Sequence, residues 1–228
     1  RAESERFITG GWVRVDGEVV DRPEARVHSF QQVALDPDAS AEPLPPVTLL
    51  WHKPSGVALP EGLHLPTAQA LTWLDAGHRW PADRPGGALP RAQLHRLQPL
   101  MPLAMDASGL MVFSQHPAIS RRLVEGMADL EQEWLIDLAV DTALPSAEQK
   151  QDCLARLNRP LGPQALRLPP LRASWQSDSR LRLALKGWTS ANLLRHLQLL
   201  ALPLAAVRRQ RIGRVGMAGL APGQWRQL

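Results

Sequence analysis

The chain has 228 residues, of which 44% are hydrophobic and 21% charged, a composition typical of a soluble globular protein with one or two cores. A single cysteine, Cys153, excludes an internal disulfide, and no apolar run reaches the roughly 20 residues that a membrane-spanning helix needs. The net charge is +4 and the basic residues are mostly arginine. Arginine suits phosphate contact, although its abundance can equally reflect genomic base composition.

Residues 1–40 are predicted to form one small unit. Residues 5–11 are typical of the end of a helix that stops at Gly10 and Gly11. Residues 12–15, 18–20 and 32–36 alternate as strands do, and Asp16-Gly17 is the turn signal of a tight hairpin. Arg1 is not an initiator methionine, so we expect further residues before it.

A proline-rich stretch separates this unit from the rest of the chain. Residues 39–46 read Ala-Ser-Ala-Glu-Pro-Leu-Pro-Pro, and the three prolines among the last four positions indicate an extended, stiff linker. We therefore predict a first domain over 1–40, a linker over 41–46 and a second domain over 47–228.

Strands and helices alternate through residues 47–228, with no internal repeat at a solenoid period. The pattern predicts strands over 47–51, 111–114, 134–140, 166–168 and 180–185. It predicts helices over 67–74, 118–127, 147–157 and 190–200, and a loop rich in proline and glycine over 81–90.

Five motifs follow one another along the chain. Residues 12–20 contain Val-Arg-Val-Asp-Gly, residues 52–56 read His-Lys-Pro-Ser-Gly, and residues 97–110 end in Ser-Gly-Leu. Residues 130–136 and the tail over 211–228, with Arg-Ile-Gly and Leu-Ala-Pro-Gly-Gln-Trp-Arg-Gln-Leu, complete the series. In this order the five pieces resemble the RNA pseudouridine synthases, in particular the ribosomal RNA (RsuA-type) subgroup. The first piece resembles the hairpin of an alpha-L RNA-binding domain, the second the signature that opens the catalytic domain, and the third the active-site segment.

The resemblance implies an α+β protein. Its first domain would be a small, incomplete alpha-L RNA-binding domain, and its second a synthase-like domain with a mixed, mostly antiparallel sheet flanked by helices. Structured RNA, above all ribosomal RNA, is the implied partner. We further expect a cytoplasmic monomer that needs no cofactor and no metal.

The active-site segment lacks the group that performs the family's chemistry. Counting back from Ser108, Ala104 occupies the position of the catalytic aspartate, and Pro102 that of the preceding arginine. In the family a carboxylate starts the detachment of uracil from ribose on a flipped nucleotide, which a methyl group cannot do. Asp106 lies two residues further on, about 6.6 Å along an extended chain. Because catalytic placement tolerates errors of only about 1 Å, we interpret Asp106 as a turn or capping residue, with rescue of catalysis as the alternative.

Two further elements of the family's site have lost charged groups. Gln132 and Trp134 stand where the family has lysine and tyrosine, and Trp134 is either a base-stacking residue or an ordinary core residue. Of the basic helix that resembles residues 190–196, only Arg195 is kept.

The remaining basic residues have two readings. One group of them is a dense cluster, Arg208, Arg209, Arg211 and Arg214. This cluster either contacts RNA phosphate or is simply solvated. Lys53 lies in a tight turn and is interpreted as structural. His95 and His196 have no partner at metal-ligand spacing, so we interpret them as ordinary surface or core histidines.

Three functional hypotheses follow. The first is an RNA-binding protein derived from pseudouridine synthases, with isomerase activity absent or very weak because of Ala104, Pro102 and Gln132. The second is a working synthase that uses Asp106 in place of the lost carboxylate. The third is a scaffold that has left RNA and binds a protein partner.

Overall fold

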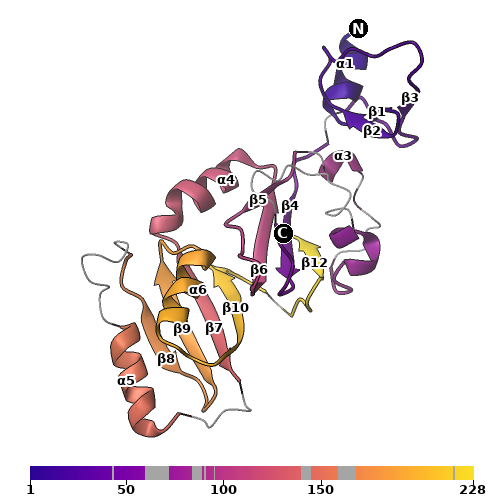
Figure 1. Ribbon diagram of the computed structural model, residues 1–228. Helices are drawn as coiled ribbons and strands as arrows, with labels where there is room; N and C mark the ends of the chain where they lie inside the picture. The colour runs from indigo at the N-terminus through magenta and orange to yellow at the C-terminus, as the bar shows by residue number, and fades with distance from the viewer. Residues whose placement is uncertain are drawn as a thin grey trace.

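The computed structural model describes residues 1–42, 44–59, 72–83, 89, 91–94, 96–139, 145–158, 168–217 and 219–228 (Figure 1). Their strands form two separate sheets, one with three strands and one with nine. The predicted α+β class is therefore confirmed. No helix among these residues combines the length and the apolar character needed to cross a lipid bilayer.

The N-terminal unit is a helix beside a small antiparallel sheet. The helix α1 (Ala2–Thr9) precedes β1 (Val13–Val15), β2 (Glu18–Val20) and β3 (Val33–Leu35), in the order β2-β1-β3. Asp16 and Gly17 connect β1 to β2 with φ values of 51° and 86°. Positive φ at both central residues is what a two-residue hairpin turn requires. The predicted helix end and all three predicted strands are confirmed.

The large sheet has the order β12-β4-β6-β10-β7-β9-β8, with β5 beside β6 and β11 beside β10. The strands are β4 (Thr48–Lys53), β5 (Gln98–Leu100), β6 (Ala107–Ser114), β7 (Glu131–Leu138), β8 (Arg172–Trp175), β9 (Arg180–Lys186), β10 (Leu204–Ile212), β11 (Val215–Gly216) and β12 (Trp225–Gln227). Every pairing of these strands is antiparallel except that of β6 with β10, which is parallel.

The parallel pairing divides the large sheet into two halves (Figure 1). One half consists of β12, β4, β5 and β6, and the other of β11, β10, β7, β9 and β8. The helical segments are η1 (Ala76–His78), α3 (Arg91–Leu94), α4 (Pro117–Val124), η2 (Glu125–Ala128), α5 (Ala147–Leu157) and α6 (Ser190–Leu199).

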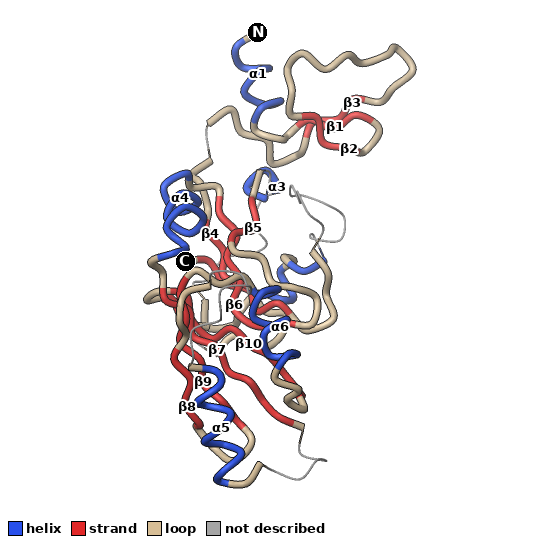
Figure 2. Tube along the Cα trace, turned by 60° about the vertical axis from the view of Figure 1, so that its left-hand side comes forward, coloured by secondary structure: helices blue, strands red, loops and turns tan. Residues whose placement is uncertain are grey.

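The two halves are covered differently. Hydrophobic clusters lie on both faces of the first half, one around Trp51 and Phe113 and the other around Leu50 and Val112. In the second half, α5 and α6 both pack on one face, where their apolar side chains join those of β7 and β9 (Figures 1 and 2). The described residues therefore bury three hydrophobic clusters rather than a single one.

The C-terminal tail completes the first half. Trp225 of β12 pairs with Trp51 of β4 and is fully buried. The indole nitrogen of Trp51 donates to the Gly223 carbonyl at 3.1 Å, and the amide of Gly223 donates to the His52 carbonyl at 2.8 Å. These contacts explain why a Pro-Gly-x-Trp pattern closes the sequence, because the tail is an edge strand docked on β4.

Most predicted elements of the second domain are found within one to three residues of their expected bounds. The predicted helix over 147–157 is α5 itself, and Ser146 and Gln149 form a reciprocal capping box at its start. The short strands β5 and β8, and the first seven residues of β10, were not predicted. Most of the predicted helix over 67–74, of the loop over 81–90 and of the strand over 166–168 lies outside the described residues.

Candidate functional site

The segment that resembles the family's active site lies where the two halves of the large sheet meet. Residues 97–110 supply β5, the loop over 101–106 and the start of β6. There β6 runs parallel to β10, with Ala107 opposite Val207, Ser108 opposite Arg208 and Gly109 opposite Arg209. The loop is therefore held by residues of both halves.

Gly109 is the residue that lets the two halves approach. Its φ is +108°, a conformation that L side chains rarely adopt. A Cβ at this position would lie 2.2 Å from the carbonyl oxygen of Arg209 and 2.6 Å from its nitrogen. Both distances are far below van der Waals contact, so only glycine fits. The Ser-Gly-Leu ending of the segment thus has a structural cause that is independent of chemistry.

Ala104 lies in the loop and is anchored through its backbone. Its amide donates to the Ser190 hydroxyl at 2.8 Å, and that hydroxyl lies 3.3 Å from the Pro102 carbonyl, to which it donates. The carbonyl of Ala104 accepts from the Ala107 amide at 3.1 Å. Ser190 is the first residue of α6, so the start of this helix fixes the loop. The only side-chain group at position 104 is a half-buried methyl.

Asp106 is exposed and follows Ala104 on the same loop. Its backbone carbonyl accepts from the Ser55 hydroxyl at 3.2 Å. Within the described part of the chain, its carboxylate makes no hydrogen bond and no ion pair. Asp106 does influence Lys53, whose charged form its negative charge favours. The carboxylate is therefore not tied into the turn, and the sequence-based interpretation of Asp106 as a capping residue is wrong for its side chain.

Lys53, at the end of β4, is hydrogen-bonded to the backbone of the loop over 101–106. Its side chain is fully buried, and Nζ donates to the carbonyls of Pro54 at 2.9 Å, Met105 at 3.1 Å and Ala107 at 2.8 Å. Burial lowers the pKa of Lys53 to about 8, against the opposing effect of Asp106. Three carbonyl acceptors use every donor of an ammonium group, so these contacts are those of a structural residue.

Arg209 is a second buried cation where the two halves of the large sheet meet, and it is 1% exposed. Its guanidinium donates to the carbonyls of Leu110 at 2.8 Å and Met101 at 2.6 Å, and to the Gln132 side chain at 3.4 Å. Burial lowers its pKa to about 9, at which the group remains charged at neutral pH. The side chain thereby connects β10 to β6 and to the first residue of the loop over 101–106.

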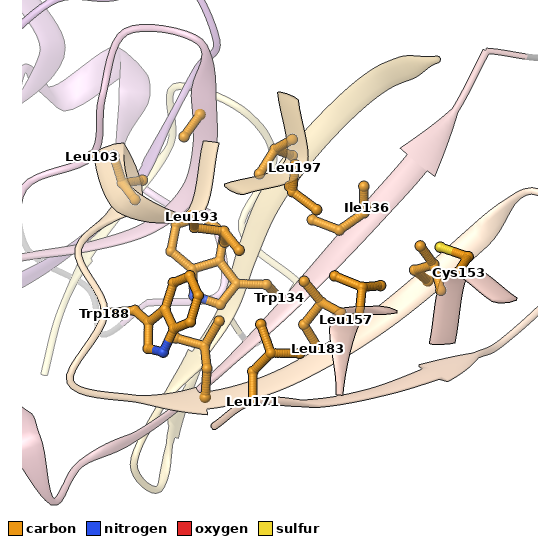
Figure 3. Close-up of a cluster of buried hydrophobic side chains, with 14 residues drawn as sticks. Leu103, Trp134, Ile136, Cys153, Leu157, Leu171, Leu183, Trp188, Leu193 and Leu197 are labelled. Carbon is orange, nitrogen blue, oxygen red and sulfur yellow. The ribbon is translucent and has the colours of Figure 1, made fainter. Parts of the chain in front are cut away.

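Trp134 is fully buried in the core beneath α6. Figure 3 shows its indole among Trp188, Leu193 and Leu183, and the Arg209 guanidinium lies 5.5 Å from its ring centre. Its Nε1 is buried without a hydrogen-bond partner among the described residues. Trp134 is therefore a core residue in this structure and not a base-stacking residue, because no part of its ring is exposed.

The predicted arginine cluster does not form a single surface. A strand places successive side chains on opposite faces, so Arg208 and Arg209 point away from each other. The register of β10 against β7 shifts between Arg209 and Arg211, and this bulge returns Arg211 to the face of Arg208. Arg214 is exposed in the turn after β10, and Arg195 is exposed on α6. Arg209 is thus excluded from the cluster, because its side chain lies in the core.

In the described ranges, no group of three or more His, Cys, Asp or Glu side chains could hold a metal ion. His196 is buried, its ring packs edge-on against Trp188 with 5.4 Å between centroids, and burial lowers its pKa. His95 lies outside the described residues.

Comparison with known proteins shows which fold this arrangement is similar to. A solved structure described as a pseudouridylate synthase aligns with 100% of this chain and 89% of its own, with a TM-score of 0.57 and 17% sequence identity. The chain has the pseudouridine synthase fold. Two complexes, of archaeal box H/ACA sRNP Nop10-Cbf5 and of Cbf5-Nop10-Gar1, align with 75% of this chain at TM-scores of 0.40 and 0.41. Their sequence identities are 15% and 14%, and 49% and 50% of those chains are covered. No family model and no curated protein matches the sequence.

Two residues organise the site in roles that were not predicted from the sequence. Ser190 anchors the loop through the Ala104 amide, and Arg209 connects the two halves from within the core. The adjacent Thr189 and Ser190, a signal for a helix start, could have indicated a polar anchor at α6. Nothing in the local pattern distinguishes Arg209 from its half-buried neighbours Arg208 and Arg211.

Proposed function

We propose that this chain is an RNA-binding protein derived from pseudouridine synthases, with isomerase activity absent or very weak. We further propose that it belongs with the ribosomal RNA subgroup and acts in the cytoplasm as a monomer on structured ribosomal RNA. Its first 40 residues would serve as an alpha-L RNA-binding domain, followed by a linker over 41–46.

The observation that carries this proposal is Ala104. The residue lies in a loop that is firmly placed by Ser190, Lys53 and the joint of the sheet. A catalytic carboxylate acts as a nucleophile or base only when it is placed within about 1 Å of its target. A preserved loop that carries a methyl group at the matching position supports loss of the chemistry with retention of the framework.

RNA binding is supported by the basic side chains that remain available. Arg195 and Arg214 are exposed, and Arg208 and Arg211 are half-buried on the face of β10 that lies away from α6. Arg209 and Trp134 have no exposed surface in this structure and do not enter the proposal as RNA contacts.

Binding is tested with an in vitro transcript of small-subunit ribosomal RNA, in filter-binding assays at several salt concentrations. We expect an affinity that falls as salt rises, because each phosphate contact releases counterions. Affinity for the transcript that is undetectable at low salt, or that does not change with salt, would contradict the proposal.

Loss of chemistry is tested by tritium release from a transcript labelled at uridine C5. We expect no release above the blank for the unaltered chain. The matched variant is Ala104→Asp, which returns the carboxylate to a loop that is otherwise unchanged. A gain of release in this variant would support a retained framework, whereas release by the unaltered chain would refute the loss of catalysis.

One observation favours the alternative of a relocated carboxylate. The side chain of Asp106 is exposed and has no structural partner among the described residues, so it is free to act. If the unaltered chain releases tritium and Asp106→Asn abolishes the release, Asp106 is the catalytic group. Release that survives Asp106→Asn excludes this role.

A further inference from the structure

In the second half of the large sheet, the helices among the described residues cover only one of the two faces (Figures 1 and 2). The strands β7, β8, β9 and β10 bury one face beneath α5 and α6 (Figures 1 and 2). On the opposite face, the charged side chains that form ion pairs are 20–83% exposed. We call this opposite face the open sheet face.

The register of the strands places the charged residues of the open sheet face in rows. One row runs across the sheet through Arg172, Ala184, Glu133 and Arg211. The next row runs through Ser174, Arg182, Leu135 and Arg208, and it continues to Ser108 on β6. Leu135 is only 9% exposed although it lies on this face. Its register neighbours Arg182 and Arg208 have long aliphatic stems of the kind that cover apolar side chains.

The open sheet face carries a surplus of positive charge. The cationic side chains of these strands on this face are Arg172, Arg180, Arg182, Lys186, Arg208 and Arg211. The carboxylates are Glu131, Glu133 and Asp137, so six positive charges face three negative ones. The surplus of three is most of the net charge of +4 of the entire chain.

The carboxylates fix the guanidinium groups in place. Glu133 accepts from Arg182 at 2.7 Å and from Arg211 at 3.3 Å, and Glu131 accepts from Arg211 at 2.7 Å and from Arg172 at 3.2 Å. These arginines hold the pKa of both carboxyls below the usual range. Each guanidinium has five donors, and this network uses only some of them. The remaining donors are held in a fixed array, which lowers the entropic cost of binding an anion.

We propose that the open sheet face binds the phosphate backbone of structured RNA. This inference rests on the proposed function and locates one surface for it. Arginine forks match phosphate oxygens, and a surplus of fixed positive charge attracts a polyanion at a distance. The loop over 101–106 packs through Leu103 into the core on the other side of the sheet. RNA held on the open sheet face therefore does not need a catalytic group at position 104.

The experiment compares two triple variants of the full chain that remove the same charge. The face variant is Arg172→Gln, Arg182→Gln and Lys186→Gln, and the control variant is Arg121→Gln, Arg122→Gln and Arg156→Gln, on α4 and α5. All three control residues are exposed. Affinity for the small-subunit ribosomal RNA transcript is measured across a salt series, and circular dichroism checks the fold of both variants.

We expect the face variant to bind about 10- to 100-fold more weakly at low salt, with the logarithmic salt slope smaller by about 2 to 3. The control variant should change affinity by less than about 3-fold. Equal effects of the two variants would overturn the inference while leaving the proposed function in place. No salt-dependent binding by the unaltered chain would instead overturn the proposed function.

A second measurement covers the outcome in which the face variant does not fold. Ultraviolet crosslinking of the unaltered chain to the transcript, followed by peptide mapping, should yield crosslinks in residues 172–186. Crosslinks confined to other segments would refute the inference. Light scattering of the face variant gives a further outcome: if it abolishes self-association and leaves RNA affinity unchanged, the face binds a second copy of the chain, and the inference is wrong.

Discussion

Replacement of Gly109 by alanine should destabilise the protein far more than the same replacement elsewhere. Two costs add at this position. The backbone has φ +108°, for which an L residue costs about 1–2 kcal/mol. The new Cβ also meets the Arg209 carbonyl oxygen at 2.2 Å, and because that atom is backbone, β6 and β10 must move apart. Overpacking of this kind costs about 1–3 kcal/mol, so the two costs together should lower the free energy of unfolding of Gly109→Ala by about 2–5 kcal/mol.

The matched control is Gly17→Ala in the hairpin of the N-terminal unit. Gly17 has a similar φ of +86°, but nothing lies within 4 Å of a Cβ placed there. It should therefore show only the conformational cost of about 1–2 kcal/mol.

Urea unfolding followed by tryptophan fluorescence measures both variants. The signal is suitable because Trp12 is buried in the N-terminal unit, the paired Trp51 and Trp225 in one half of the large sheet, and Trp134 in the other half. If Gly109→Ala costs no more than Gly17→Ala, close approach of β10 is not the reason for glycine in this segment. In that case the contact between β6 and β10, where the two halves of the large sheet meet, does not require glycine.

Three other changes test the same region. Arg209→Leu should lower the free energy of unfolding by about 2 kcal/mol, because buried acceptors lose their donor. Arg214→Leu on the surface should change it by less than about 0.5 kcal/mol, and equal values for the two variants in urea unfolding would contradict this prediction. Lys53 has a folded pKa of about 8 against 10.5 unfolded, so its charging opposes folding fully below pH 8, and this cost disappears as pH rises from 8 to 10.5. The unfolding free energy of the unaltered protein should thus rise relative to that of Lys53→Met by up to about 3 kcal/mol across this window, and a difference that stays constant with pH would be inconsistent with a lowered pKa. Ser190→Ala should cost about 1 kcal/mol and accelerate hydrogen exchange at the Ala104 amide, and unchanged exchange there would show that α6 does not anchor the loop.

Much of the fold could be predicted from local signals. The helix over 147–157 is found with the same bounds, because its capping residues and apolar spacing are both encoded nearby. The hairpin at Asp16-Gly17 follows from the backbone requirement of its turn. Shorter strands were missed: β8 has only four residues, and β5 three, one of which is proline. Such pieces become strands only because a neighbouring strand supplies their hydrogen bonds.

The location of the candidate site was predicted from the sequence, but most of the contacts that hold it were not, because they depend on distant parts of the chain. The position of Ala104 in its segment is a matter of counting along the chain, and the structure places that segment at the joint of the sheet. Which polar groups hold the loop was not evident, because Lys53, Ser190 and Arg209 reach it from three distant parts of the chain. Contacts of this range depend on how the halves of the sheet pack, not on local spacing.

The sequence by itself determined the order of the motifs, the absence of a carboxylate at position 104 and the richness in arginine. The tertiary structure decided which arginines can meet a ligand. Along a strand the side chains alternate between two faces, and a bulge changes which face the following residues take. The sequence alone therefore does not say which arginines of a run face the core. The bulge in β10 exists only against its partner β7. It places Arg209 in the core and Arg211 on the open sheet face, a distinction that is made by pairing between strands rather than by the residues themselves.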